Sequence, residues 1–307
     1  MSLARRLWIY QASRFPLAKN LPLLAVFSAA SLSVSAHLAG RPLPDVAAFA
    51  AAFGLAVILF FQLRAADEWK DHAVDLHARP ERPIPSGVIG LSTILRLAAA
   101  LGLPALLLAW SQDVVWLLLL AWAWMAAMTL EFGARDWLRR HPVATLLSHM
   151  MIIPLIDLLL TGVEWRGGGA APALGWFLAL SFFNGCVLEI GRKCWAPESE
   201  RPGVESYSAN WGLRRAVLAW GACLACAAGC LIGLGLAFDA RLSLPLVSPA
   251  FVMAGLAGLG LAAGAAIAGW LAAAPRKAGE KALDAASGLW ILTCYACAGG
   301  LPLLGDI

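Results

Sequence analysis

Residues 45–66 read DVAAFAAAFGLAVILFFQLRAA, an almost unbroken apolar run. A helix of this length rises about 33 Å at 1.5 Å per residue, and the hydrocarbon core of a bilayer is about 30 Å thick. Backbone N–H and C=O groups find no water in lipid, so such a run crosses a membrane as a helix. This stretch therefore predicts a membrane-spanning helix.

Similar runs recur from one end of the chain to the other. Of its 307 residues, 61% are hydrophobic and 14% are charged, with a mean hydropathy of +0.74. A typical soluble domain has about a quarter of its residues charged. The expected fold is all-α, a polytopic membrane bundle of about nine transmembrane helices. We predict the spans at residues 21–38, 45–66, 91–111, 113–132, 143–162, 172–191, 213–237, 246–273 and 282–304.

The chain is expected to have two parts. Residues 1–20 mix arginines and a lysine with Trp8, Tyr10 and Phe15, which is typical of an amphipathic segment at a membrane interface. Residues 21–307 then form one nine-helix membrane catalytic domain. No soluble domain fits between the apolar runs.

The basic residues indicate the orientation. Nineteen of the 23 Lys and Arg residues fall in residues 1–20 or in every second loop after that, whereas the alternate loops hold only Arg41, Arg166 and Arg241. Cytoplasmic loops carry such an excess. We therefore expect a multi-pass protein of the cell (inner) membrane with its polar site toward the cytoplasm. The basic residues form no continuous stripe, which excludes nucleic acid as a partner.

Acidic residues gather directly after the second predicted span. Asp67, Asp71 and Asp75 are four residues apart, so on a helix they share one face. Three like charges on one face repel each other, and a divalent cation relieves this repulsion. Mg²⁺ prefers one or two carboxylates together with phosphate oxygens, so the spacing favours a Mg²⁺ site for a phosphorylated substrate. The alternative is a solvated helix end paired with Arg64 and Lys70.

A stiff loop follows the acidic residues. Residues 79–87 read RPERPIPSG. The three prolines restrict the backbone, and Gly87 permits a turn. We expect this loop to hold Arg82 near the carboxylates, where its guanidinium can bind a phosphate. A rigid interhelical turn with a cytoplasmic arginine is the simpler alternative.

A second polar cluster follows the sixth predicted span, on the same side of the membrane. Glu189 and Lys193 are four residues apart and can pair, whereas Glu198 and Glu200 follow a proline on a loop. Facing clusters can hold a diphosphate through shared metal ions, with basic residues taking the remaining phosphate charge. Ordinary loop charge is the alternative. The cluster comprises Asn184, Glu189, Arg192, Lys193, Glu198, Glu200, Arg201, Glu205, Tyr207 and Ser208.

Four further polar residues lie in or near the spans. Glu131, His149, Asp157 and Asp284 are costly in lipid and are expected to face the bundle interior. Each is either an acceptor-binding or acid/base group or a hydrogen-bond partner in packing, and we favour packing. Arg140, near the cytoplasmic end between the fourth and fifth spans, adds to the field around a diphosphate or simply anchors the loop.

The first motif carries a family resemblance. Asp67-Glu68-x-x-Asp71-x-x-x-Asp75, followed by residues 82–87 (RPIPSG), resembles the first signature of the UbiA superfamily of intramembrane prenyltransferases. That signature has an Asn-Asp-x-x-Asp-x-x-x-Asp stretch and then an Arg-Pro-x-x-Ser-Gly loop. The nine spans and the two acidic clusters also match. The chain departs from the family at its second motif, where Glu198 and Glu200 stand in place of an Asp-x-x-x-Asp pair.

The resemblance implies an intramembrane, Mg²⁺-dependent prenyltransferase. Such an enzyme ionises an isoprenyl diphosphate within membrane lipid and transfers the prenyl group to a lipophilic or aromatic acceptor. The resemblance implies that Asp71 and Asp75 bind metal, with Asp67 in the place of the family's Asn, and that Arg82 binds the diphosphate. Together with the polar clusters, it leads us to predict Asp71, Arg82 and Lys193 as catalytic residues and Asp67, Asp71, Asp75, Glu198 and Glu200 as metal ligands. The predicted substrate-binding residues are Arg64, Glu68, Arg82, Arg140, Asn184, Glu189, Arg192 and Lys193.

Other functions remain open on the sequence. A UbiA-type terpene cyclase would use the same metal site but fold one chain onto itself. A polyprenyl-phosphate glycosyl-type transferase would take the diphosphate of a sugar donor. A transporter should show broken mid-bilayer helices in paired repeats, which the sequence lacks. A purely structural membrane subunit has little use for aligned carboxylates.

Overall fold

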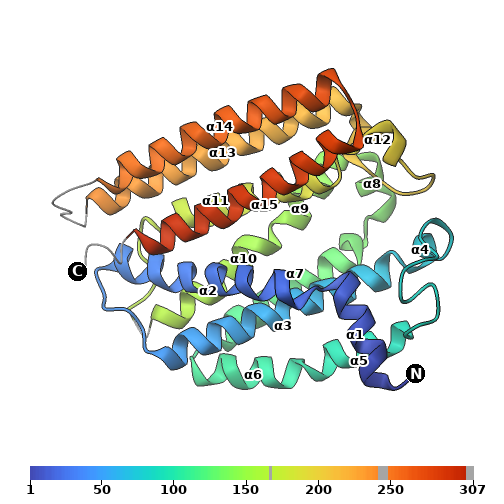
Figure 1. Ribbon diagram of the computed structural model, residues 1–307. Coiled ribbons are helices and arrows are strands. Elements are labelled where there is room, and N and C mark those ends of the chain that lie inside the picture. Colours follow the sequence, from blue (N-terminus) through green and yellow to red (C-terminus); the bar gives the residue numbers. More distant parts are fainter. Residues whose placement is uncertain (166–167, 241–247, 302–307) are drawn as a thin grey trace.

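The computed structural model describes residues 1–165, 168–240 and 248–301, and this part of the chain forms helices without any strand. The long helices cross the bundle, and the short ones connect them (Figure 1). Their bounds are α1 Leu3–Arg14, α2 Leu17–Ala39, α3 Val46–Lys70, α4 His72–Ala78, α5 Leu91–Ala100, α6 Gly102–Ser111, α7 Val115–Thr129, η1 Glu131–Gly133, α8 Arg135–Arg140, α9 Pro142–Met150, α10 Ile152–Trp165, α11 Leu174–Arg192, η2 Pro197–Ser199, α12 Tyr207–Trp211, α13 Leu213–Asp239, α14 Pro249–Ala273 and α15 Lys277–Gly300.

Each predicted span falls on a helical segment, so the all-α membrane bundle is confirmed. Within the described residues, eight segments are long and apolar enough to cross a membrane. The remaining predicted span, residues 113–132, corresponds to α7, which is shorter than predicted. It ends at Thr129 because Glu131 and Phe132 adopt the left-handed conformation, each with φ 52°, which a helix cannot continue.

Two of the predicted spans contain a break. The third consists of α5 and α6, which meet at Leu101, and the fifth consists of α9 and α10, which meet at Met151. Pro104 and Pro154 follow these junctions by three residues. A proline lacks the N–H for its helical hydrogen bond, and its ring clashes with the carbonyl four residues earlier. The breaks therefore lie in the turn that each proline disturbs.

The helices pack as a layered bundle around one extended apolar core. Helix α2 packs against α3, α10 and α15, and α11 packs against α13 and α15, with α14 on the outside against α13 and α15 (Figure 1). Small residues allow the closest approaches. A Cβ atom on Gly299 would lie 2.7 Å from the Cα of Ala30, so α15 and α2 touch through their backbones.

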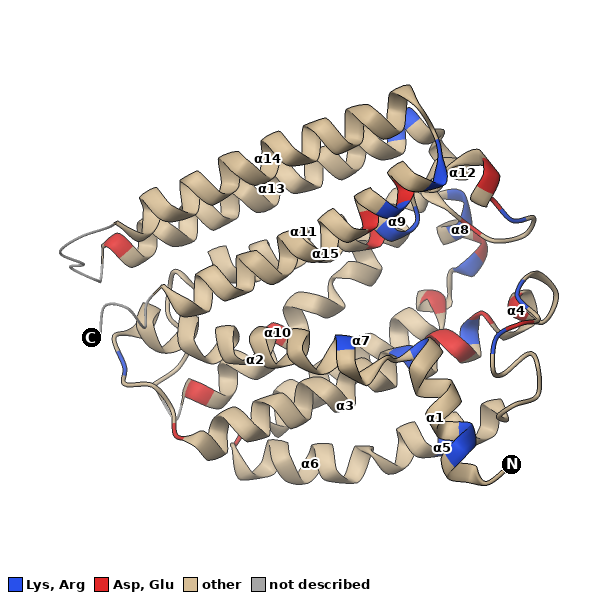
Figure 2. Cartoon of the chain, in the orientation of Figure 1, with Lys and Arg blue, Asp and Glu red and all other residues tan. Residues whose placement is uncertain are grey.

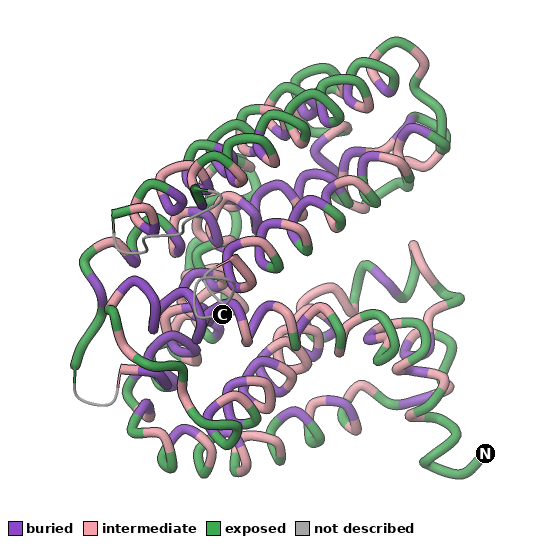
Figure 3. Tube along the Cα trace, turned by 60° about the vertical axis from the view of Figure 1, so that its left-hand side comes forward, coloured by how far each residue is buried: buried purple, intermediate pink, exposed green. Residues whose placement is uncertain are grey.

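The outer surface of the bundle is apolar. Buried positions lie on the inward sides of the helices, and exposed ones lie outward (Figure 3). Phe251 and Leu259 on α14 are 76% and 73% exposed. Contiguous exposed apolar area is unfavourable in water and favourable in lipid. The chain is therefore a multi-pass membrane protein.

Charged residues gather at one end of the bundle. Lys, Arg, Asp and Glu concentrate where α4, α8 and α12 lie, whereas the opposite end has few (Figure 2). Helix α2 begins at the charged end and α15 runs toward the other one (Figure 1). The two acidic clusters of the sequence thus share one end of the molecule. Arg166, Arg241 and parts of two predicted spans (residues 246–247 and 302–304) lie outside the described residues.

Candidate active site

The three aspartates follow one helical path across the end of α3. Asp67 lies in the last turn of α3, Asp71 joins α3 to α4, and Asp75 lies in α4. The backbone N–H of Asp71 donates to the carbonyl of Asp67 at 2.9 Å, and that of Asp75 donates to the carbonyl of Asp71 at 2.9 Å. The predicted helical spacing of the three carboxylates is confirmed.

The three carboxylates have different surroundings. Asp75 is buried and paired with Arg79 at 3.2 Å and with Arg82. The Asp67 side chain is 42% exposed and lies 3.4 Å from Arg64. The carboxylate of Asp71 makes no hydrogen bond or ion pair with any other described residue. Burial raises the pKa of Asp71, and the charge of Asp67 raises it further. Of the three carboxylates, Asp71 is therefore the one whose negative charge the protein stabilises least, and the one that a bound cation would stabilise most.

The proline loop places Arg82 next to Asp75, the last of the three aspartates (Asp67, Asp71 and Asp75, here called the acidic row). The N–H of Ser86 donates to the carbonyl of Arg82 at 2.9 Å, and Gly87 has φ +76°, so the loop closes as a non-helical turn. Ile84 and Ile89 anchor it in a small apolar cluster. The guanidinium of Arg82 pairs with Asp75, which confirms the predicted position near the carboxylates. Burial lowers the pKa of Arg82, and the positive charges of Arg14 and Arg79 lower it further.

The amino-terminal segment is part of this end of the bundle. Tyr10 of α1 is buried against Ala65, Ile84 and Ile89. Glu68, which we predicted to bind substrate, is 3% exposed and accepts a hydrogen bond from Nε of Arg14 at 2.5 Å. Sequence analysis did not single out Arg14, because no spacing links residue 14 to residue 68.

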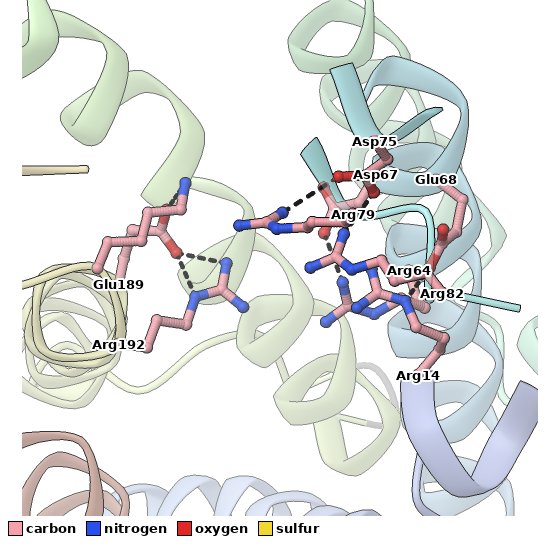
Figure 4. Close-up of polar contacts among 10 residues, drawn as sticks. Arg14, Arg64, Asp67, Glu68, Asp75, Arg79, Arg82, Glu189 and Arg192 are labelled. Atoms are coloured by element: carbon pink, nitrogen blue, oxygen red, sulfur yellow. Dashed lines mark hydrogen bonds and ion pairs between the residues drawn. The ribbon is translucent and has the colours of Figure 1, made fainter. Parts of the chain in front are cut away.

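The end of α11 lies opposite the acidic row. Glu189 pairs with Arg192 at 2.6 Å and with Lys193 at 2.7 Å, as its spacing from Lys193 predicted. Figure 4 shows Glu189 and Arg192 on one side and the group around Asp67, Arg64 and Arg79 on the other. The positive charge of Lys193 also lies near Asp71 and lowers the pKa of its carboxyl group.

The two helix ends are also joined through their loops. The guanidinium of Arg79 lies 5.9 Å from the centre of the Trp195 ring. Arg201 donates to Glu81 at 3.0 Å and to the carbonyl of Ala78 at 3.0 Å. The loop after α4 and the loop after α11 therefore contact each other beside the charged residues.

Four other predicted site residues lie farther from this centre or are already hydrogen bonded. Asn184 is 1% exposed and accepts from Trp290 at 2.9 Å, inside the bundle. Glu198 accepts from the backbone N–H of Lys277 at 2.6 Å, at the start of α15. The carboxylate of Glu200 accepts from Ser206 and Ser208. Arg140 is exposed on α8 and donates to the carbonyl of Asp136 at 3.1 Å.

The donor set at the end of α3 fits a magnesium ion that arrives with a phosphorylated substrate. In the described ranges, no group of three or more His, Cys, Asp or Glu residues lies close enough together to hold a metal ion by itself. Mg²⁺ keeps several waters and needs only one or two carboxylates when phosphate oxygens complete its shell. The unpaired Asp71 and the half-exposed Asp67 are oxygen ligands of this kind.

Fold and site define an all-helical, polytopic membrane protein in which an acidic helix end faces a basic one. Its structure is similar to that of digeranylgeranylglyceryl phosphate synthase, a UbiA-superfamily enzyme, with a TM-score of 0.63 and 12% sequence identity over 96% of this chain and 99% of that one. The UbiA-like fold expected from the sequence is thereby confirmed. No protein-family model and no curated protein matches the sequence.

Proposed function

We propose that the protein is an intramembrane, Mg²⁺-dependent prenyltransferase that ionises an isoprenyl diphosphate and transfers the prenyl group to an acceptor. The observation that carries the proposal is the unpaired Asp71, which lies near the positive charges of Lys70 and Lys193. The same end of the bundle also holds Arg79 and Arg82 beside Asp75, and Arg192 beside Glu189. This arrangement suits a polyanion that brings a cation with it. The UbiA-like fold and the neighbour's activity as a synthase of a prenylated lipid support it.

The basic residues would bind the diphosphate. Each guanidinium has five N–H donors, so Arg79 and Arg82 can hold phosphate oxygens while they remain paired with Asp75. Lys193 approaches from α11 as a point charge. Bound Mg²⁺ would neutralise phosphate charge at Asp67 and Asp71. As the bond from the prenyl carbon to oxygen breaks, Arg82 and Lys193 stabilise the negative charge that collects on the departing diphosphate.

The remaining predicted residues would support this centre. Arg64, Arg192 and Glu189 border the substrate and fix the positions of its charged neighbours, and Arg140 adds positive charge from α8. Glu68 would act through Arg14 and not by direct contact. Asn184 lies deeper, where the prenyl chain or the acceptor would pass.

Glu198 and Glu200 stay our prediction for the second metal-binding pair. A carboxylate offers about four lone-pair positions, so the hydrogen bonds from Lys277 and from Ser206 and Ser208 leave capacity for a cation. Exchange of Glu198 for Gln keeps the acceptor oxygen for the Lys277 N–H but removes the charge. We expect E198Q to need more Mg²⁺ for half-maximal activity with little change in thermal unfolding.

The membrane location fits the substrate. A prenyl chain enters such a bundle sideways from lipid, and the diphosphate stays at the charged end. We place that end in the cytoplasm and the protein in the cell (inner) membrane, on the excess of Lys and Arg in the loops there. Residues 1–20 would lie at the same interface.

The test is a reaction of the purified protein with Mg²⁺, a panel of prenyl diphosphates and membrane lipid extract, followed by mass analysis. We expect diphosphate release together with new prenylated products that appear only when extract is added. Release of a cyclic hydrocarbon or alcohol without extract would assign a terpene cyclase instead. The absence of diphosphate release with every donor would refute the proposal.

A further inference from the structure

Lys70 lies within the acidic row in the chain but does not pair with it in the fold. It directly precedes Asp71 and follows Asp67 by three residues, a spacing at which side chains on a helix meet. A helix end closed by salt bridges to Arg64 and Lys70 is therefore the natural alternative to a metal site. Arg64 does approach Asp67, at 3.4 Å, but Lys70 pairs with neither of these two described aspartates.

The ammonium group of Lys70 is instead bound by two residues of other elements. Its Nζ lies 2.7 Å from Oε1 of Glu131 in η1 and 3.4 Å from Nε2 of His149 in α9. Nδ1 of His149 lies 2.9 Å from the carbonyl oxygen of Thr145, so this nitrogen carries the hydrogen. In the neutral ring, Nε2 is then free to accept from the ammonium. Lys70 thus has its partners outside the acidic row.

The backbone around Glu131 is strained, and its position is enforced by packing. Glu131 and Phe132 both have φ 52°, a left-handed conformation that is unfavourable for residues with a side chain. The ring of Phe132 packs against Trp124 at 5.4 Å and against His149 at 5.9 Å. Strain of this kind persists where surrounding contacts enforce it, and it is common at functional sites. These aromatic contacts hold the turn, so the carboxylate of Glu131 is in place to receive Lys70.

We propose that Glu131 is a positioning residue that draws the ammonium group of Lys70 away from Asp67 and Asp71 and so keeps both carboxylates open to Mg²⁺. The inference rests on the function proposed above, in which Mg²⁺ arrives with an isoprenyl diphosphate.

A released Lys70 would compete directly with the metal ion. Its four-carbon stem is long enough to bring the ammonium to Asp67, whose side chain is 42% exposed, and its charge already lies near Asp71. An ammonium group and Mg²⁺ bind the same carboxylate oxygens. A magnesium site that takes only one or two carboxylates from the protein is weakened when one of them is occupied. The pair of Lys70 with Glu131 removes this competitor, whereas the chain spacing alone would favour it.

The test measures cation binding directly, in lipid nanodiscs, with Mn²⁺ as the spectroscopic probe of the Mg²⁺ site and inorganic diphosphate in place of substrate. Electron paramagnetic resonance counts the free Mn²⁺ and gives its Kd. We expect E131Q to raise this Kd about fivefold or more, the factor that one competing ion pair at a partly exposed carboxylate supplies. The Mg²⁺ concentration for half-maximal release of diphosphate from geranylgeranyl diphosphate should rise in parallel.

A double-mutant cycle separates competition by Lys70 from the loss of one negative charge. If Lys70 is the competitor, E131Q has no effect once Lys70 is replaced, so E131Q/K70Q should bind Mn²⁺ as K70Q does. E131D keeps the charge but withdraws it by one methylene, so it should also raise the Kd, and it serves in place of E131Q if that variant does not fold. D136N removes a negative charge from exposed α8 at the same end and should leave the Kd unchanged.

The outcomes distinguish the inference from the proposed function. If E131Q raises the Kd equally with Lys70 present and with Lys70 replaced, Glu131 acts through its own charge, and the inference is wrong while the proposed function stands. A wild-type Kd in both E131Q and E131D contradicts it in the same way. If the wild-type protein binds no Mn²⁺ with diphosphate and releases no diphosphate from any prenyl donor, the proposed function fails and the inference fails with it.

Discussion

Nε of Arg14 lies 2.5 Å from Oε1 of Glu68, which ties the short helix ahead of the first span to the last turn of α3. The Glu68 side chain is 3% exposed and that of Arg14 is 15% exposed, so the pair is shielded from water. The amino-terminal helix is thus bound to the same turn that carries Asp67. Its contact with the site follows from the fold and not from the sequence spacing.

Removal of Arg14 should destabilise the protein. Loss of one partner from a buried ion pair leaves an uncompensated charge and costs about 3–5 kcal/mol. We expect R14Q to lower the unfolding temperature in detergent, and R14Q/E68Q to recover part of the loss because the stranded charge is gone. R6Q, at an exposed position of the same helix, is the control. An R14Q protein as stable as wild type would contradict a structural role for the pair.

Asp71 should be essential for turnover and dispensable for folding. Asp71→Asn removes the one carboxylate of the row without a partner among the described residues, so no ion pair is broken. We expect turnover to fall by about 100-fold or more, as expected when charge stabilisation at a reacting phosphate is lost. Chelation of Mg²⁺ should have the same effect. Unchanged activity after either treatment would overturn the metal site, and D136N on exposed α8 is the control.

Arg82 should not be replaceable by lysine. Its fork-shaped guanidinium can serve Asp75 and a phosphate together, whereas an ammonium group is a single point of charge. We expect R82K to raise the KM for the prenyl diphosphate by about tenfold, the result of losing one charge-assisted contact. Steady-state kinetics with R96K as the control test this. An R82K enzyme with wild-type KM would place the diphosphate elsewhere.

The contacts of Glu131 with Lys70 and His149 should stabilise the fold except in acid. The pKa of Glu131 is lowered from 4.5 to about 2 on folding, so the folded state favours the charged form. This stabilisation is complete above the unfolded pKa and is lost as the pH falls from 4.5 toward 2. We expect the difference in unfolding temperature between wild type and E131Q to be constant near neutral pH and to shrink over that range. A difference that grows in acid would contradict the assigned pairs.

Reporter fusions test the orientation. Fusions after Ala240 and after Ile307 should read as external, because the charge bias places these positions on the side with few Lys and Arg. A fusion within the loop at Gly203 should read as cytoplasmic. A cytoplasmic signal at either of the first two positions would refute the proposed topology.

Local chemistry determined much of this protein from the sequence alone. The long apolar runs required membrane-spanning helices because lipid offers no partner to the backbone. The spacing of Asp67, Asp71 and Asp75 placed three carboxylates on one helical path, since that path depends only on residues four apart. The prolines and Gly87 in the loop after them fixed a turn that holds Arg82. All of these features are short-range.

Contacts between distant segments were decided only by the tertiary structure. No pattern relates Arg14 to Glu68, or Lys70 to Glu131 and His149, because these pairs form when separate helices pack. Nor did the sequence show that Glu131 would leave the helical conformation, since the cost of its left-handed backbone is offset by partners from two other helices. The sequence determined which residues are charged and where the long apolar segments of the bundle lie. Packing decided which of those charges meet, and so left Asp71 unpaired among the described residues while Asp75 and Glu68 acquired arginine partners.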